Sequence, residues 1–434
     1  MPFKIPAALK KERLNYILAI SAVLFLISGM FVSRAMMSIG MITAGCLLLI
    51  PGNFKIAWNK FLKNKALIGI TSVFFIYLIS GLYSEDKAFF LERLNLKLPF
   101  LILPLAFCAF PAFKERHFNN IMYYFLLLTA CFSLGSTFLF ILNYQEISES
   151  YLSAKVLPTI VNHIRFSLMI AMAIFVGLYL FIQKHGFRFK WERHTIAAMT
   201  IFLFAFLHVL SVRSGLLAFY SATAILSLTY ILSFKDIKKT TAVLAAVITL
   251  PLIMYSISPT LQNKIAYMKE DVGRFVKGKN VNDYSDGNRL LSWKIGIEIG
   301  NTNPLIGVGI GDVKNKTFDI YEQNYPEIEN DNHLIPHNQF IFIYSGLGIL
   351  GLAIFIIASF YPLVISRGKF LFAAINIIII SSYISEATIE NQLGTCLYLS
   401  FFLLTWHYYQ NKTSISCEND VNNLQSGKKA YQES

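Results

Sequence analysis

Apolar runs of membrane-spanning length alternate with short polar segments along almost the whole chain. A helix needs about twenty apolar residues to cross a hydrocarbon core about 30 Å thick, and most of the runs approach that length. The pattern predicts an all-α membrane protein with about twelve transmembrane helices. The predicted spans cover residues 17–33, 35–52, 66–84, 98–113, 121–142, 167–182, 196–212, 216–234, 240–258, 341–366, 370–389 and 395–409.

One long polar stretch, residues 259–340, interrupts the apolar pattern between the ninth and tenth spans. Within it, the side chain of Ser285 or Asp286 is expected to cap a helix. The Asn-Thr-Asn-Pro sequence of residues 301–304 is expected to end that helix. By helical spacing, its apolar face is predicted to contain Leu290, Trp293 and Ile297.

The pattern divides the chain into four parts. Residues 1–258 hold the first nine spans, residues 259–340 form a long loop with short helices, and residues 341–409 hold the last three spans. The tail, residues 410–434, is rich in Gln, Asn, Ser and Lys, a composition typical of disorder. Residues 85–97 mix acids, bases and aromatic residues, as a helix lying at the membrane interface does.

The composition supports the membrane assignment. Hydrophobic residues make up 55% of the chain and charged residues 15%, whereas charged residues make up roughly 25% of soluble domains. The net charge of +13 does not come from one basic patch, because Lys and Arg are spread among the short segments between spans. This spread is typical of the positive-inside rule, and we expect no nucleic-acid partner.

The Lys and Arg distribution also predicts the orientation. If the N-terminus is cytoplasmic, 22 of the 38 Lys and Arg residues lie in cytoplasmic segments and 7 in short outward segments. The other 9 lie in the long loop, whose length weakens its influence on orientation. Both termini are therefore predicted to be cytoplasmic, with the loop outside the membrane.

The five cysteines do not indicate a disulfide or a metal site. Cys46, Cys108, Cys131 and Cys396 lie within apolar spans and Cys417 lies in the tail, so no pair falls in the outward loop. No Cys or His cluster has ligand spacing, and we expect neither a metal nor another cofactor.

Two arginines are candidates for binding an anion. Arg213 lies in Ser-Val-Arg-Ser-Gly between two spans, and Arg289 lies near the start of the predicted loop helix. Either side chain could simply extend to headgroups or solvent. However, the turn at Arg213 is very short, a guanidinium matches phosphate geometry, and a helix N-terminus attracts anions. We expect the two arginines to hold a diphosphate.

His337 precedes the tenth span in the sequence Ile-Pro-His-Asn-Gln-Phe. It is either a hydrogen-bonded structural group or a proton acceptor, a task for which histidine is suited near neutral pH. His333 would share a helix face with His337, but Pro336 disfavours a regular helix through both. We therefore rank His333 below His337.

Four further charged or titratable residues lie near the outward ends of spans. His163 and Arg165 precede the sixth span, and Glu386 and Glu390 lie near the end of the eleventh. A carboxylate at that depth is costly without a partner, so one of the two acids is expected to orient an active-site arginine. The alternative is that both acids are exposed at the interface.

Two groups of glycines flank the histidines. The sequence Gly-Val-Gly-Ile-Gly at residues 307–311 is similar to a nucleotide-binding fingerprint, but no strand–helix–strand unit surrounds it. We expect a tight structural turn there. Gly346, Gly348 and Gly351 at the start of the tenth span are expected to allow close helix packing.

The His337-Asn338 pair and the glycines after it resemble the signature of the O-antigen ligase superfamily. That signature is His-Asn, nine residues, Gly-x-x-Gly and a final Gly, Thr or Tyr. This chain has Gly348-Ile-Leu-Gly351 at the matching distance and Leu352 at the final position. Leu352 is therefore a departure, and it weakens the resemblance to the ligases more than the resemblance to the superfamily.

Three other segments carry the same resemblance. Arg213 in Val-Arg-Ser-Gly is similar to the family's Ser-Arg-Gly segment, and Gly287-Asn288-Arg289 followed by Trp293 to its Gly-Arg…Trp segment. Residues 303–311 are similar to its Pro-x-x-Gly-x-Gly segment. The motifs cover about residues 210–352, and the twelve-span layout extends the resemblance over the chain.

The resemblance implies a glycosyltransferase of the bacterial inner membrane with its active face in the periplasm. The donor would be a glycan on a polyprenyl-diphosphate carrier, and the reaction would be metal-independent and inverting. The expected catalytic residues are His337 as base and Arg213 and Arg289 as cations for the leaving diphosphate. Expected substrate-binding residues are His163, Arg165, His333, Asn338 and Glu386.

Three acceptors and one other class of protein remain open. A ligase would use lipid A–core, a polymerase another lipid-linked repeat, and an oligosaccharyltransferase a protein side chain. A transporter of lipid-linked substrates would place ionisable residues or broken helices near mid-membrane. The candidate residues instead gather at the outward ends of the spans, which favours an enzyme.

Overall fold

The computed structural model describes residues 7–143, 158–183, 189–233, 237–257, 259–278, 282, 284–366 and 368–432, and every element in this part of the chain is helical. The first half contains α1 Ala7–Val32, α2 Arg34–Leu49, α3 Asn53–Leu62, α4 Lys65–Ser80, α5 Lys87–Ala109, α6 Glu115–Leu142, α8 His163–Ile182 and α9 Lys190–Leu210. The second half contains α10 Arg213–Ser233, α11 Ile237–Ile257, α12 Pro259–Val276, α13 Ser285–Thr302, α14 Val313–Asn324, α15 Gln339–Ile365, α16 Phe370–Ser385 and α17 Gln392–Gln432. Two short 3-10 helices, η1 Asn330–Asn332 and η2 Thr388–Glu390, complete the set.

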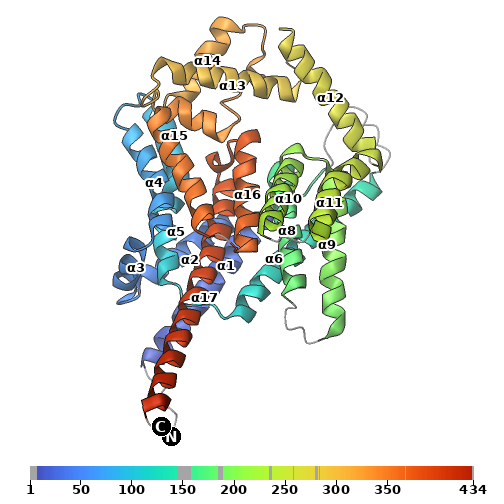
Figure 1. Cartoon of the computed structure of the whole chain (residues 1–434). Helices are drawn as coiled ribbons and strands as arrows, with labels where there is room; N and C mark the ends of the chain where they lie inside the picture. The colour runs from blue at the N-terminus through green and yellow to red at the C-terminus, as the bar shows by residue number, and fades with distance from the viewer. Residues whose placement is uncertain are drawn as a thin grey trace.

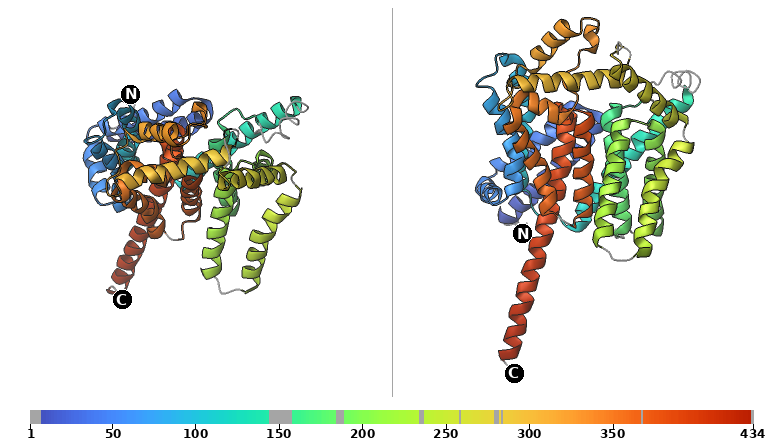
Figure 2. Two further views of the ribbon diagram at one scale, coloured as in Figure 1. Left: turned by 90° about the horizontal axis from the view of Figure 1, so that it is seen from above. Right: turned by 45° about the horizontal axis from the view of Figure 1, so that its top comes forward.

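The long helices form an upright bundle, and the polar helices lie across one of its ends (Figure 1). The helices α12 and α13 run over this end from the side of α10 and α11 to the side of α4 and α15 (Figure 2). The start of α1 and the end of α17 lie at the opposite end. The residues between the ninth and tenth predicted spans are therefore separated from both ends of the chain by the thickness of the bundle.

The membrane character of the bundle rests on the length and apolarity of its helices. Six described helices are long and apolar enough to cross a membrane, or seven if α2 and α3, bent by 102° at a short break, count as one span. The helices α4 and α16 are apolar but shorter. The protein is thus an all-helical chain of membrane-protein type, and the count of about twelve spans stays a prediction.

Most of residues 85–97, which were expected to form an interfacial helix, are helical but belong to a longer helix. These residues begin α5, which starts at Lys87 and continues without a break to Ala109. Asp86 caps the helix by accepting a hydrogen bond from Phe89 N at 2.9 Å. The charged residue Lys97 is tolerated inside this continuous helix because it is fully buried against a carboxylate, as described below.

The cap predicted for the loop helix was wrong. The N-cap residue of α13 is Tyr284, and its side chain makes no capping hydrogen bond. The carboxylate of Asp271, on α12, instead accepts hydrogen bonds from Asp286 N and Gly287 N, both at 2.7 Å. A residue from another helix therefore satisfies the free N–H groups that a local Ser or Asp satisfies in an isolated helix.

The apolar face predicted for α13 differs from the buried face. Leu291, Ile295 and Ile299 are buried, and they pack with Tyr321 of α14 and Ile328 in a small core of their own. Ile297, from the predicted face, is 45% exposed. Both sets have helical spacing, and packing against α12, α14 and α15 rather than periodicity decides which one is covered.

The expected disorder of the C-terminal tail stays a prediction. Helix α17 continues to Gln432, well beyond the predicted twelfth span. It leaves the bundle as a single extended helix (Figures 1 and 2). A helix already formed in the bundle grows by one hydrogen bond for each added residue, so a polar sequence can continue it.

A break in α15 joins the polar segment to the bundle. Gly348 has φ 61° and ψ −165°, a conformation outside the helix. The backbone around it bonds to the glycine-rich turn: Val308 N donates to Ser345 O at 3.0 Å, and Ile349 N to Pro304 O at 2.8 Å. These bonds satisfy backbone groups that the break would otherwise leave unpaired in an apolar setting.

The glycines of residues 307–311 form the tight turn predicted from the sequence. Gly307 and Gly309 have φ of +71° and +94°. A Cβ on Gly307 would lie 2.4 Å from the carbonyl carbon of Gly346, and one on Gly309 2.5 Å from the hydroxyl of Ser84. Close approach of three chain segments, not phosphate binding, explains this pattern.

We expect Gly348→Ala to destabilise the protein. Its conformation is essentially restricted to glycine and costs other residues about 1–3 kcal/mol, and the added Cβ would lie 2.3 Å from the carbonyl carbon of Leu305. Thermal unfolding in detergent should show a midpoint several degrees lower. Gly368→Ala is the control, because Gly368 also has positive φ but no atom within 4 Å of its Cβ. Equal midpoints for the two variants would contradict this account of α15.

Candidate functional site

The carboxylate of Glu386 lies at the centre of a charged cluster beneath α13. Glu386 follows α16, and its side chain is only 4% exposed. Its Oε1 accepts a hydrogen bond from Arg289 Nη2, on α13, at 2.9 Å. Its Oε2 lies 3.6 Å from Arg165 Nη1, on α8. Two guanidinium groups from separate helices thus share one carboxylate, and the cluster keeps a net positive charge.

His337 borders the same carboxylate. Its Nε2 lies 3.9 Å from Glu386 Oε2, which is beyond hydrogen-bond distance. Its Nδ1 lies 3.2 Å from the carbonyl oxygen of Ile335. Because a carbonyl oxygen only accepts, Nδ1 must carry the proton in the neutral ring. The hydrogen bond therefore leaves Nε2 as the unprotonated nitrogen, facing the charged cluster.

The backbone of His337 is held by α13. Its N–H donates to the hydroxyl of Ser292 at 3.2 Å, and its carbonyl accepts from Trp293 Nε1 at 3.1 Å. The hydroxyl of Ser292 in turn donates to Arg289 O. The one helix that carries Arg289 therefore also fixes the position of His337.

Asn338 joins α15 to the segment that carries Glu386. Its Oδ1 caps α15 by accepting from Phe340 N at 2.9 Å and Ile341 N at 3.1 Å. Its Nδ2 donates to Ile384 O at 2.9 Å. The side chain expected to bind substrate is thus already engaged by the backbone at both its oxygen and its nitrogen.

Arg213 lies at the start of α10 and forms an ion pair with Asp286, near the start of α13. It lies close enough to Arg289 for the two charges to interact. Burial raises the pKa of Asp271, the residue that caps α13, although the Gly287 N–H and the two arginines favour its ionised form. The structure therefore brings the two predicted arginines to one end of α13.

Lys264 is a buried cation beside Arg213 that the sequence analysis missed. Its Nζ donates to Leu210 O at 3.2 Å and Ser211 O at 3.3 Å, at the end of α9. Ser211 has a φ of 47°, which is unusual for a residue other than glycine. Lys264 therefore stabilises the sharp turn from which Arg213 begins α10.

His163 and His333 have different surroundings. His163 begins α8 and lies within electrostatic range of Glu386, Arg289 and Lys264. The ring of His333 instead stacks on Tyr321 with centroids 4.4 Å apart, and its Nε2 bonds to Ile328 O. His163 therefore lies near the charged cluster, whereas His333 packs against Tyr321 of α14.

A second buried carboxylate holds the segment between α16 and α17 in place. Glu390 accepts hydrogen bonds from Tyr77 at 2.5 Å, Lys97 at 2.9 Å and Gln339 at 2.9 Å. Burial would raise the pKa of Glu390, but the charges of Lys97 and Arg93 outweigh it and lower the pKa. Because Gln339 follows Asn338 in the chain, this network fixes the segment of Glu386 against the segment of His337.

The donor set of the cluster suits an anion. Arginine, lysine and histidine N–H groups dominate it, and a guanidinium presents five donors of which a carboxylate uses one or two. Among the described residues, no group of three or more His, Cys, Asp or Glu could hold a metal ion. The residues that the sequence analysis missed, Lys264 and Asp271, carried a weak signal, since both are charged positions within the polar helix α12.

The protein is a helical bundle of membrane-protein type that carries a cationic cluster at one end. Residues 197–356 match the family model of the O-antigen ligases. The match supports membership of the O-antigen ligase superfamily, whose members are glycosyltransferase-like enzymes. No curated protein matches the chain. The matched residues include Arg213, Arg289 and His337, whereas Arg165 and Glu386 lie outside them.

We expect Lys264 to make stability depend on pH in a defined window. Burial, together with Arg213, lowers the pKa of Lys264 from 10.5 to about 8. Between these values the unfolded chain binds more protons than the native state, so stability rises with pH through this window. The thermal midpoint of the wild type, measured relative to Lys264→Met, should therefore increase from about pH 7.5 to about pH 10.

The control for this measurement is Lys269→Met, which removes an exposed lysine from the same helix. It should show the same pH dependence as the wild type. A constant difference between wild type and Lys264→Met across the window would show that Lys264 keeps an ordinary lysine pKa.

Proposed function

We propose that the protein is an O-antigen-ligase-like glycosyltransferase that moves a glycan from a polyprenyl-diphosphate carrier to an acceptor. The observation that carries the proposal is the cluster in which Glu386 is shared by Arg165 and Arg289 and bordered by His337. A leaving diphosphate needs cations, and an attacking hydroxyl needs a base. The family match supports lipid-linked glycan and acceptor partners in general.

In the proposed reaction, the oxygen of the acceptor hydroxyl forms a bond to the anomeric carbon of the donor sugar. The bond from that carbon to the diphosphate oxygen breaks, its electron pair leaves with the diphosphate, and the configuration inverts. The hydroxyl proton passes to Nε2 of His337, the nitrogen left unprotonated by the bond from Nδ1 to Ile335 O. Glu386, 3.9 Å from Nε2, stabilises the imidazolium that forms.

Arg289 and Arg213 supply the positive charge for the leaving group. Each already holds one carboxylate, Glu386 or Asp286, which orients the guanidinium and leaves other N–H groups for phosphate oxygens. We assign Asn338 and Glu390 to positioning, because their contacts are within the protein. In this proposal the reaction needs no metal, since arginines do the work of a cation at the diphosphate.

We propose that the site faces the periplasm from the bacterial inner membrane, with both termini in the cytoplasm. The distribution of Lys and Arg supports this orientation. The start of α1 and the end of α17 both lie at the end of the bundle opposite α13 (Figure 1). The alternative within the superfamily is a polymerase, whose acceptor is another lipid-linked repeat. Product analysis after gene deletion separates the two. Loss of a ligase should leave the polymer on its lipid carrier, whereas loss of a polymerase should leave single lipid-linked repeats.

A transporter explains the site less well. Its ionisable residues are expected near mid-membrane, whereas Arg213, Arg289 and Glu386 lie at helix ends next to the polar segment. The break of α15 at Gly348 is occupied by residues 304–309, which bond to its backbone. The candidate residues therefore favour chemistry at the bundle's end over passage through it.

Replacing Arg289 by Lys should impair turnover strongly. Lysine keeps the charge but loses the fork that binds Glu386 and phosphate together, and losing one oriented donor costs about 3 kcal/mol, or about 10²-fold in rate. Arg213→Lys should behave similarly. The assay uses purified protein in detergent with a lipid-diphosphate glycan and an acceptor. The control is Arg274→Lys on α12, whose partly exposed side chain contacts Glu270 and Tyr284 rather than the cluster. A divalent ion required by the wild type would contradict the proposed role of the arginines.

The variant His337→Ala tests the proposed base. General-base catalysis contributes about 10²–10⁴-fold, so transfer should fall by that factor while the affinity for the donor changes little. Donor binding is measured separately with the same lipid-diphosphate glycan, which distinguishes a loss of chemistry from a loss of folding or binding. Transfer near the wild-type rate would remove the histidine from the mechanism.

The matched control is His333→Gln. His333 stacks on Tyr321 away from the cluster, and Gln can keep a hydrogen bond to Ile328 O. We expect its transfer rate to stay within a few fold of the wild type. An equal loss in both variants would indicate that general damage to the polar segment, not loss of a base, explains the His337 result.

A further inference from the structure

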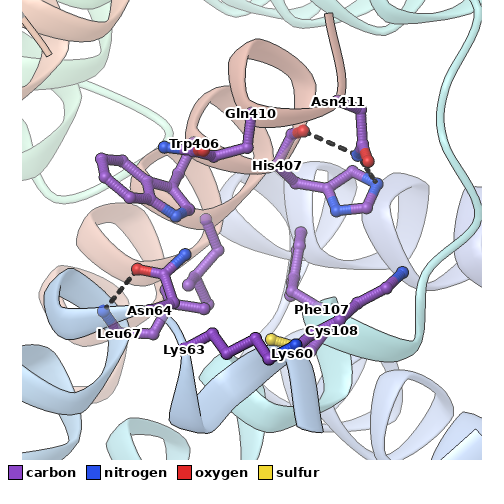
Figure 3. Close-up of a pocket in the computed structure, with 11 residues that line it drawn as sticks. Lys60, Lys63, Asn64, Leu67, Phe107, Cys108, Trp406, His407, Gln410 and Asn411 are labelled. Atoms are coloured by element: carbon purple, nitrogen blue, oxygen red, sulfur yellow. Dashed lines mark hydrogen bonds between the residues drawn. The ribbon is translucent and has the colours of Figure 1, made fainter. Parts of the chain in front are cut away.

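A pocket lined by polar and apolar side chains lies between α3, α4, α5 and α17, with a volume of about 310 Å³. Figure 3 shows Trp406, His407, Gln410 and Asn411 of α17 on one side and Lys60, Lys63 and Asn64 on the other. Its residues come from the ends of α3 and α5, the start of α4 and the middle of α17, all away from α13, so it is separate from the site around Glu386 (Figure 1). The proposed function does not use it.

The lining of the pocket suits an anion with an apolar body. Among the described residues that line it there is no Asp or Glu, while Lys60 and Lys63 bring two ammonium groups. Neither lysine forms an ion pair with another described residue. Three apolar side chains complete the wall, namely those of Leu67, Phe107 and Leu403.

Two further donors point to a ligand. The indole N–H of Trp406 is buried without a hydrogen-bond partner among the described residues, and the side chain as a whole is only 4% exposed. The Oδ1 of Asn64 accepts from Leu67 N at 3.3 Å, and its amide nitrogen is turned toward the pocket (Figure 3). Buried donors without partners are uncommon, because each costs free energy on folding.

The helix α3, which borders this pocket, has the features of a helix at a membrane surface. It is bent by 102° from the apolar helix α2, so it lies across the direction of the bundle. Phe54 is 53% exposed and Trp58 44% exposed, and their rings stack on each other. Lys55 and Lys60 belong to the same helix. Exposed aromatic residues next to lysines are typical of a helix that lies in the headgroup layer.

We propose that this pocket binds the phosphate headgroup of an anionic membrane lipid. The phosphate lies between Lys60 and Lys63 and accepts from the amide of Asn64, and the glycerol and acyl chains follow the apolar wall. The position of α3 favours a lipid over free phosphate, which offers the same charge but nothing for Phe107 and Leu403 to contact. The binding is independent of glycosyl transfer.

Titration of the detergent-solubilised full chain with dihexanoyl phosphatidylglycerol tests the proposal. Tryptophan fluorescence should change and reach saturation, and Trp406→Phe should remove the change while the other three of the four tryptophans remain. Lys60→Gln/Lys63→Gln should raise the half-saturating concentration about tenfold or more. The matched control, Lys55→Gln/Lys65→Gln, removes the same charge from outside the pocket and should bind as the wild type does.

Three outcomes would overturn the proposal. Equal binding of dihexanoyl phosphatidylcholine would show that anionic charge is not recognised, and an equal loss in both double variants would show a diffuse surface effect. Inorganic phosphate that binds as tightly as the lipid would assign the site to free phosphate. Native mass spectrometry of co-purified phosphatidylglycerol gives a second readout. The Lys60→Gln/Lys63→Gln variant should retain less lipid than the control variant. Equal retention by the two variants would contradict the proposed site.

Discussion

The buried carboxylate of Glu386 is the contact on which the candidate site depends. A single charge of this kind is costly in an apolar bundle unless it is paired, and removing its partners is more costly still. Here it is paired twice, with Arg165 of α8 and Arg289 of α13, and it lies beside His337. These partners come from segments far apart in the chain, so satisfying one acid also sets the relative positions of the proposed cations and the proposed base.

Two acids only four residues apart have different surroundings and therefore different uses. Glu390 lies inside the bundle, where Tyr77, Lys97 and Gln339 all donate hydrogen bonds to its Oε1 and hold the backbone in place. Glu386 faces guanidinium groups that keep further N–H donors and remain partly exposed, with 23% for Arg289. The buried contacts of Glu390 supply rigidity and the partly exposed guanidinium groups around Glu386 supply binding capacity, which is the arrangement a preorganised site requires.

Much of this arrangement could be predicted from the sequence, because apolar run length sets the helices and short polar segments set their ends. Arg289 near a helix start, the tight turn at residues 307–311 and an acid orienting an arginine all follow from local patterns. The cap of α13 could not be predicted, since Asp271 lies on another helix. Nor could its buried face be predicted, because two faces have helical spacing and tertiary contacts, such as those with Tyr321 and Ile328, select one.

The glycines near His337 shape the backbone that supports the candidate site. In an unbroken α15, the backbone N–H and C=O groups would bond within the helix and would not be free to bond to residues 304–309. Helix α13 would then be joined to the bundle mainly through side chains. The break at Gly348 exposes N–H and C=O groups that this segment satisfies, and Ser345 Oγ also donates to Gly296 O of α13 at 2.8 Å. Because α13 holds the backbone of His337 and carries Arg289, the contacts at the break in α15 help to place the proposed base and the proposed cation together against the bundle.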